Sequence, residues 1–228
     1  MISMESLVNL IAPVDGREGR FYGVAVGVVT NIQDPEKLGR VKVKFPWLSE
    51  KDESRWARIV SPMGIYFFPK VEDEVLVIFE HGDMNFPYIL GGLWNNEDKP
   101  PASGDYGEKT QRLLKSSSGH TIVLDNTEKG EKIILESSSG HTIVLDDTEK
   151  GEKIILESSS GQSIVLEDRE NGGKIVISDN TGKNKIEIDS TNNTMTIAVE
   201  NNLIIEAKGK ISMKGNEIDM KGNEISMN

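Results

Sequence analysis

KISMKGNEIDMKGNEISMN, residues 210–228, is built from a unit that recurs every seven residues. Each unit places a methionine two positions after an isoleucine, at Ile211 and Met213, Ile218 and Met220, and Ile225 and Met227. A coiled coil spaces its apolar positions by three and four, whereas a spacing of two led by a β-branched residue is typical of a strand. Glycines at 209, 215 and 222 permit tight turns between the units. The segment is therefore predicted to be β-structure.

The short repeat also bears on the number of chains. Seven residues provide one strand and one corner, which is only about a third of a turn around a closed β-helical core. A single chain needs two or three strands in each coil to enclose its own core. Three copies around a common axis each need to supply one face per level. We therefore predict that residues 111–228 form an intertwined triple-stranded β-helix, and that the protein is an obligate homotrimer.

Longer repeats precede this tail. SSSGHTIVLDNTEKGEKIILE (116–136) is followed by a copy at 137–157 that differs only in having Asp147 where the first has Asn126. A looser third copy spans 158–178, so the period is 21 residues. Each copy holds two strand-like runs separated by turns that contain glycine.

Composition divides the chain into two parts. Every aromatic residue lies at or before Tyr106, and all eight prolines lie at or before Pro101. A narrow core of Ile, Val, Leu and Met has no room for rings, and proline would remove ladder hydrogen bonds. We predict an N-terminal segment (1–20), a barrel (21–97), a linker (98–110) and a β-helix (111–228).

The first part contains five apolar runs bounded by turn residues, at 24–32, 39–45, 56–62, 74–80 and 86–94. In RVKVKF, Val41, Val43 and Phe45 are predicted to face one side and the two lysines the other, as in a half-buried strand. A small antiparallel barrel fits so few strands better than a sandwich does. The predicted fold class is all-β.

Composition also excludes several classes of function. The chain has no cysteine, which excludes disulfides and thiolate chemistry. Its net charge of −11 argues against general nucleic-acid binding, and the cations Arg40, Lys42 and Lys44 beside Phe45 and Trp47 are expected to serve packing or subunit contacts instead. The N-terminus lacks the basic region and cleavage site of a signal peptide, so we expect synthesis in the cytoplasm without export by that route.

Three stretches carry a resemblance to a known family: TNIQDPEKLGRVKVKFPW (30–47), SRWARIVSPMG (54–64) and PKVEDEVLVIFEHGDMNFPYILGGLWN (69–95). They resemble the oligonucleotide/oligosaccharide-binding (OB) type barrel of the central spike proteins of contractile injection machines, namely the phage baseplate assembly protein V group and the VgrG spikes of type VI secretion. The resemblance implies a barrel followed by a trimeric β-helix. It also implies a structural puncturing spike, without enzymatic activity, in a phage-tail-like particle.

The sequence departs from the family pattern in several places. It has no room for a large hub part or a lysozyme domain, so it is similar to short spikes that rely on a separate hub or baseplate protein. Glu72 stands where the family often has a glycine before the aspartate. No histidine follows His141, which is unlike spikes that end in a His-x-His iron site. The resemblance thus implies a separate tip protein of the PAAR-repeat kind, with the tube protein and effectors as further possible partners.

Two contact sites are expected from this arrangement. The hub contact is assigned to apolar residues near the N-terminus: Leu7, Val8, Leu10 and Ile11. The tip-protein docking site is assigned to the last residues of the β-helix: Met220, Ile225, Met227 and Asn228.

No catalytic, cofactor or metal site is predicted, and the protein is expected not to be an enzyme. His120 and His141 occupy equivalent places in two repeats, where a solvent-facing turn is favoured over a metal-binding ring. The repeated serines lack an adjacent base, and the acidic corners with Lys129 and Lys150 are read as a solvated edge. Five barrel carboxylates lack the cleft of a glycosidase pair: Glu72, Asp73, Glu74, Glu80 and Asp83.

Two alternative functions remain open, a β-helical polysaccharide-degrading enzyme and a trimeric tail fibre or adhesin. The sequence also leaves open whether the particle is a phage, a secretion system, or an extracellular or membrane-anchored injector.

Overall fold

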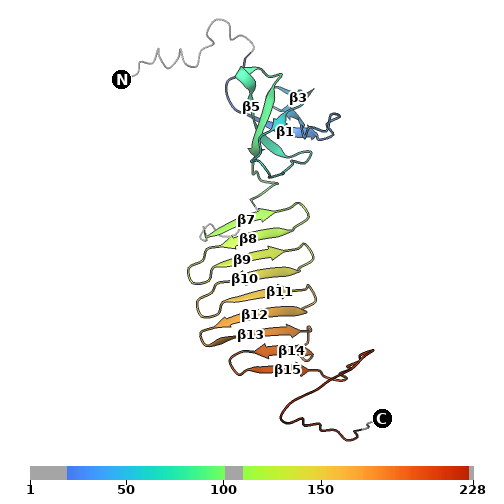
Figure 1. The fold of residues 1–228 in the computed structure, drawn as a ribbon. Coiled ribbons are helices and arrows are strands. Elements are labelled where there is room, and N and C mark those ends of the chain that lie inside the picture. The colour runs from blue at the N-terminus through green and yellow to red at the C-terminus, as the bar shows by residue number, and fades with distance from the viewer. Residues whose placement is uncertain (1–19, 101–109, 226–228) are drawn as a thin grey trace. The chain divides into compact units, whose positions relative to one another are not determined.

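The computed structural model describes residues 20–100 and 110–225, and the chain divides into two units, Met1–Ser103 and Gly104–Asn228. Both units are built from strands (Figure 1). The helical structure of the described residues is limited to the short 3-10 turn η1 (Glu80–Gly82). In these two ranges there is no helix long and apolar enough to cross a membrane.

The first unit is a six-stranded mixed sheet with the order β3-β2-β1-β5-β6-β4. Its strands are β1 (Ala25–Asn31), β2 (Lys42–Phe45), β3 (Ser49–Glu53), β4 (Arg58–Ile59), β5 (Glu74–Phe79) and β6 (Pro87–Gly92). Neighbouring strands are antiparallel except β4 and β6, which are parallel. An antiparallel bridge between Val41 and Ala57 joins the start of β2 to the start of β4 and closes the sheet on itself.

The core of this unit follows the alternation of its strands. Val41, Val43 and Phe45 are buried and the lysines between them are not, which confirms the prediction for this run. Val29 from β1, Val77 from β5 and the other inward residues complete the same cluster. The short strand β3 was not predicted, because its sequence SEKDE is wholly polar and carries no apolar alternation.

The turn that precedes β5 keeps the geometry that a glycine would provide. Glu72 has a φ of 75°, in the left-handed region that non-glycine residues rarely adopt. Its backbone N–H donates to Val29 O at 2.8 Å, and Lys70 N donates to the Asp73 carboxylate at 2.7 Å. The turn is therefore kept although Glu72 replaces the glycine of the family pattern, and the backbone of Glu72 is strained as a result.

The second unit is a nine-stranded antiparallel sheet in which every strand pairs with its neighbours in sequence. The strands are β7 (Gln111–Lys115), β8 (Thr121–Asp125), β9 (Lys132–Glu136), β10 (Thr142–Asp146), β11 (Lys153–Glu157), β12 (Ser163–Arg169), β13 (Gly172–Ser178), β14 (Lys185–Asp189) and β15 (Thr194–Ala198). Figure 1 shows them stacked in chain order. Each 21-residue repeat supplies two of the strands, as its pattern predicts.

The pairing in this sheet differs from the interlacing expected for residues 111–228. Strands β8 to β14 have both edges occupied by strands of the same chain, whereas interlaced chains would place another chain there. The reason lies in the connections, because each short turn reverses the chain and returns it beside the strand it has just left. The structure therefore shows β7 to β15 paired within one chain and does not show interlaced strands.

Residues 199–225 behave differently from the repeats before them. They form no strand within the chain, although the Ile-x-Met pattern predicts strands there. Ile211, Ile218 and Ile225 are each more than half exposed. A strand needs a hydrogen-bonded neighbour, and the seven-residue units do not pair with one another in a single chain.

Candidate functional site

One face of the nine-stranded sheet carries two adjacent columns of side chains that are apolar except for Arg112 in β7, and we call it the apolar face. Each column takes one residue from every strand, and the pairing registers place these residues side by side. The first column is Leu114, Ile122, Leu135, Ile143, Leu156, Ile164, Ile177, Ile186 and Ile197. The second is Arg112, Leu124, Ile133, Leu145, Ile154, Leu166, Ile175, Ile188 and Met195.

The described residues of the chain leave the apolar face uncovered. From β8 to β14 its side chains keep between 37% and 43% of their surface exposed, and Met195 at the far end keeps 64%. Soluble proteins rarely expose a contiguous aliphatic patch of this extent unless it binds another surface. The apolar face is therefore the main candidate interaction site of the second unit.

The opposite face, which we call the charged face, has a different composition. A central column of Val and Ile runs from Val123 to Val176 and is flanked by charged and hydroxyl side chains. On one flank, acidic and basic residues alternate from strand to strand: Asp125, Lys132, Asp146, Lys153, Glu167, Lys174 and Asp189. Opposite charges side by side stabilise cross-strand pairs, so this face is suited to contact with water.

Asp146 is the most buried charged residue on the charged face. Its side chain accepts hydrogen bonds from Lys132 Nζ at 3.1 Å and from the Thr148 backbone N–H at 3.1 Å. Burial opposes ionisation, but the hydrogen bonds from Thr148 and Lys132 outweigh it and leave the pKa of Asp146 below its ordinary value. The carboxylate therefore fastens β10 to β9 and to the loop that follows.

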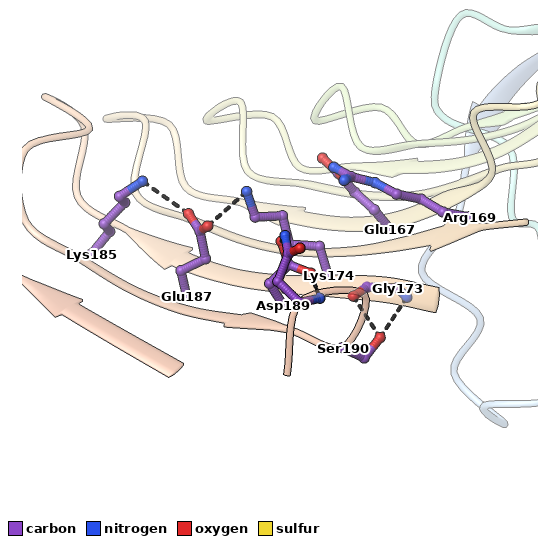
Figure 2. A network of polar contacts seen from close by, with 9 residues as sticks. Glu167, Arg169, Gly173, Lys174, Lys185, Glu187, Asp189 and Ser190 are labelled. Atoms are coloured by element: carbon purple, nitrogen blue, oxygen red, sulfur yellow. Dashed lines mark hydrogen bonds and ion pairs between the residues drawn. The ribbon is translucent and has the colours of Figure 1, made fainter. Parts of the chain in front are cut away.

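The charged face becomes wholly polar at β14, where Glu187 replaces the aliphatic residue of the central column. Figure 2 shows Glu187 between two lysines, with its carboxylate 2.7 Å from Lys174 Nζ and 2.9 Å from Lys185 Nζ. The hydrogen bonds from Lys174 and Lys185 lower the pKa of Glu187. This end of the sheet thus presents paired charges on one side and isoleucine on the other.

A glycine is required where the hairpin between β12 and β13 meets the next turn. Ser190 Oγ accepts a hydrogen bond from Gly173 N at 2.6 Å and donates one to Gly173 O at 2.8 Å (Figure 2). A Cβ atom at position 173 would lie 2.8 Å from the backbone oxygen of Glu167. Any side chain there would therefore force the two backbones to shift apart.

His120 and His141 lie in solvent-facing turns, but each ring has a structural partner. His120 Nδ1 accepts a hydrogen bond from Ser138 N at 3.1 Å, and His141 Nδ1 accepts one from Ser159 N at 3.0 Å. Each histidine therefore connects its own turn to the equivalent turn of the next repeat. Within residues 20–100 and 110–225, no group of three or more His, Cys, Asp or Glu residues is arranged to hold a metal ion.

The other edge of the sheet contains the acidic corners. Lys129 Nζ lies 3.5 Å from the Glu149 carboxylate of the next loop, and Asp125 Oδ1 accepts the Thr127 N–H at 2.9 Å. These acidic groups therefore hold turns and connect loops, in line with the reading of this edge as solvated.

The predicted tip-docking residues lie at the end of the described tail. Met220 is 53% exposed and Ile225 is 51% exposed, and neither belongs to a strand. Met227 and Asn228 lie outside the described residues, as do the predicted hub contacts Leu7, Val8, Leu10 and Ile11.

The barrel carboxylates considered for catalysis occupy separate places with structural partners. Asp83 accepts hydrogen bonds from the backbone and side chain of Asn85, both at 2.9 Å, and these lower its pKa. Glu80 accepts the phenolic hydrogen of Tyr88, and Asp73 holds the turn at Lys70. The geometry brings no pair of them together across a cleft.

Two cations of the barrel, Arg40 and Lys42, are likewise held by acidic neighbours. Arg40 Nε donates to Asp34 Oδ2 at 2.9 Å and Arg40 Nη2 donates to Asp34 Oδ1 at 2.8 Å. Lys42 Nζ lies 3.0 Å from the Glu53 carboxylate. The charges of Arg40 and Lys42 are therefore compensated within the barrel, which supports the expected packing role of these two residues.

Sequence reasoning missed two features of these surfaces. The alternating charges on one flank were present in the repeats, where an acidic residue and a lysine recur seven positions apart, as in Asp125 and Lys132. The histidines recur with the 21-residue repeat, but their contacts join residues 18 positions apart and depend on how closely successive turns stack. Val was also expected in the axial core, but the strand valines lie on the charged face.

Comparison with known proteins links the barrel to one domain family. The family model described as "Type VI secretion system/phage-baseplate injector OB domain" matches residues 25–94. This range covers all six strands of the first unit.

Similarity to known proteins extends over part of the chain. The type VI secretion system spike protein VgrG5 of Pseudomonas aeruginosa is 32% identical over 119 residues, covering 46% of this chain and 15% of that protein. VgrG3 of Vibrio cholerae, also a type VI spike protein, is 33% identical over 94 residues, covering 37% and 9%. The actin cross-linking toxin VgrG1 of Vibrio cholerae is 32% identical over 75 residues, covering 29% and 7%.

The matched part is therefore less than a sixth of the length of each of these relatives. The closed sheet, its buried core and the matched range agree with one another. Residues 25–94 belong to the type VI secretion system/phage-baseplate injector OB-domain family, and over part of its length the chain is a distant homologue of the VgrG spike proteins.

Proposed function

We propose that this protein is the structural puncturing spike of a contractile injection machine, and that three copies associate through their apolar faces. In this arrangement the nine-stranded sheets form the three sides of a prism, with Ile, Leu and Met inside and the charged faces outside. The proposal rests on the two uncovered columns of apolar side chains that run along the sheet from β8 to β15. Family membership of the barrel supports a place in an injection machine.

Three copies fit the geometry better than two. The apolar face is only two side chains wide, so its columns suit a narrow axial core shared by three sheets. The tail provides the second reason, because a seven-residue unit supplies only about a third of a turn. We propose that residues 199–225 pair between chains, which accounts for the lack of a strand partner within one chain.

The mechanical role follows from the ladder of backbone hydrogen bonds between neighbouring strands. When a contracting sheath pushes on the particle, axial force passes from a hub through the barrels into the shaft and onto the target envelope. Bending the shaft requires many ladder hydrogen bonds to break together, each worth on the order of 1 kcal/mol net. Packing of three sheets around one core adds resistance to shear, because each sheet is held by the other two.

Partners at the two ends complete the proposal. Leu7, Val8, Leu10 and Ile11 contact a hub or baseplate protein. Met220, Ile225, Met227 and Asn228 end the core and seat a tip protein of the PAAR kind, and methionine suits this role because it adapts to irregular apolar surfaces. The tube protein and effectors are further proposed partners within the same particle.

The protein acts in this account without catalysis, cofactor or nucleic acid. The polar groups of the barrel are engaged in turns and ion pairs, such as Asp34 with Arg40, which supports a structural role. A polysaccharide-degrading enzyme would release glycan fragments from cell envelopes incubated with the purified protein. A tail fibre or adhesin would bind intact cells without any other component of the particle.

The experiment that tests the proposed function compares particles assembled with the full chain and with residues 1–210. Electron cryo-microscopy along the long axis is expected to show a central threefold spike in both. The tip density is expected only with the full chain, because the docking residues are deleted from the other. Particles without this chain at the central axis would contradict the proposal, and a truncated spike that still carries its tip would contradict the docking assignment.

A further inference from the structure

One edge of the nine-stranded sheet is built from turns that repeat almost unchanged. The turns between β7 and β8, β9 and β10, and β11 and β12 span residues 116–120, 137–141 and 158–162. In each, the first serine hydroxyl accepts the backbone N–H of the last residue, as Ser116 Oγ does from His120 N at 3.0 Å. The glycine of each turn has a φ between 86° and 95°, a conformation that glycine adopts without strain.

Successive turns lie close enough to contact one another. A Cβ atom on Gly119 would lie 3.7 Å from Ser138 Cβ in the next turn, and one on Gly140 would lie 3.7 Å from Ser159 Cβ. The imidazoles bridge the same gaps, His120 to Ser138 N at 3.1 Å and His141 to Ser159 N at 3.0 Å. The identical contact occurs twice, which makes it a property of the repeat.

The direction of these hydrogen bonds fixes the chemical form of the rings. A backbone N–H is always a donor, so Nδ1 of each histidine must carry a lone pair and no proton. The neutral ring then carries its proton on Nε2. A protonated imidazole has N–H groups at both positions and can accept no hydrogen bond from an amide.

The third turn provides an internal comparison. Gln162 stands in the place of the histidine, and its side-chain oxygen accepts hydrogen bonds from Ser158 and Ser160 within its own turn. The series of turn-to-turn side-chain bonds therefore ends at Gln162. A glutamine at this place is compatible with the turn and does not respond to protons.

We infer that His120 and His141 make the first three turns of this edge a proton-sensitive seam. Protonation of either ring replaces an acceptor with a donor that faces the serine N–H, so the bond between neighbouring turns is lost. This seam consists of the two histidine–serine hydrogen bonds between neighbouring turns. The bonds are present when the imidazoles are neutral and are lost as the rings take up protons. Acidification therefore loosens the edge of β7 to β12, while the edge beyond Gln162 keeps its structure.

The charged residues that pair with the positions next to the two histidines belong to the adjoining strands. Lys115 of β7 and Glu136 of β9 pair with Thr121, the residue after His120. Glu136 and Glu157 pair with Thr142, the residue after His141. The turns themselves contribute only serine, glycine and glutamine besides the histidines.

Hydrogen exchange of the full-length protein tests this inference. The amides of Ser138 and Ser159 are measured in the wild type, His120→Gln and His141→Gln at about pH 8 and about pH 5, the range over which histidine changes charge. Comparing variants at one pH cancels the effect of pH on intrinsic exchange. At about pH 8, the Ser138 amide is expected to exchange about threefold to tenfold faster in His120→Gln than in the wild type.

Each variant is the control for the other. His120→Gln is expected to leave the Ser159 amide unchanged, and His141→Gln to leave the Ser138 amide unchanged. At about pH 5, the wild type is expected to lose the slower exchange of these two amides, so that their exchange rates in the three proteins agree within about twofold. Two results would overturn the inference. One is that the wild-type amides at about pH 5 still exchange about threefold to tenfold more slowly than those of the variants. The other is that the Ser138 amide of His120→Gln exchanges at the wild-type rate at about pH 8.

Discussion

Asp34 and Arg40 form a two-point contact in the barrel, with Arg40 Nε 2.9 Å and Arg40 Nη2 2.8 Å from the two carboxylate oxygens of Asp34. Asp34 also accepts the backbone N–H groups of Glu36 and Leu38, so one carboxylate organises the loop from 34 to 40. Its side chain is only 3% exposed. The aspartate and arginine of the family-like stretch 30–47 therefore have a structural explanation.

The first prediction concerns pH. The hydrogen bond from Arg40 holds the pKa of Asp34 well below the ordinary 3.8, so the ionised form stabilises the folded barrel. This contribution is fully present above 3.8 and is lost as the pH falls below it. All three tryptophans lie in the first unit, so tryptophan fluorescence reports unfolding of the barrel alone. Asp34→Asn is expected to unfold at lower temperature than the wild type at neutral pH, and the difference is expected to shrink in acid. An equal difference at both pH values would contradict this assignment.

The second prediction concerns the strained turn before β5. Glu72→Val places a β-branched residue at a φ of 75° and is expected to lower the stability of the barrel by about 1–2 kcal/mol. Glu72→Gly relieves the strain but adds freedom to the unfolded chain, so its net effect is expected to stay within about 1 kcal/mol. Denaturant unfolding followed by tryptophan fluorescence measures both. A valine variant as stable as the glycine variant would show that the turn does not need the left-handed conformation.

The third prediction separates the two faces of the sheet with one substitution at adjacent positions. Ile154→Lys puts a charge into the apolar face, and Ile155→Lys puts the same charge onto the charged face of the same strand. Ile154→Lys is expected to prevent association or to cause aggregation, because a lysine cannot be buried unpaired in an aliphatic core. Ile155→Lys is expected to keep the mass of the wild type in solution. If both variants keep that mass, the apolar face is not the interface.

The fourth prediction concerns the hairpin at β13. Gly173→Ala forces Cβ to within 2.8 Å of the Glu167 backbone oxygen, and it is expected to cost about 1–3 kcal/mol and to expose the amides of β12 and β13. Gly151→Ala is the matched control, because its Cβ would lie 3.7 Å from Thr148 O, an ordinary van der Waals distance. Circular dichroism during denaturation and hydrogen exchange measure the two effects. Equal stability of the two variants would mean that the backbones at Gly173 can separate without cost.

Parts of this fold follow from local sequence patterns. The alternation in RVKVKF predicted the buried Val41, Val43 and Phe45, and the 21-residue repeat predicted two strands per copy. Strand β3 was not predicted because its residues are all polar. It forms by antiparallel pairing with the neighbouring strand β2.

The partner of each strand was harder to predict than the strands themselves. Periodicity specifies which side chains share a face, but both a hairpin within one chain and interlaced chains satisfy it. The short turns decide in favour of hairpins for β7 to β15. The contacts of His120 and His141 depend on how closely the turns stack, which the sequence does not express.

Sedimentation equilibrium of the purified, folded protein distinguishes a three-sheet prism from a single chain. A mass of three times the chain mass of 25.2 kDa, about 76 kDa, is expected, with the β-sheet signal intact. A folded species at 25.2 kDa would mean that the apolar face stays in water and would contradict the three-sheet prism. A dimer of about twice that mass would replace the prism with a two-sheet sandwich.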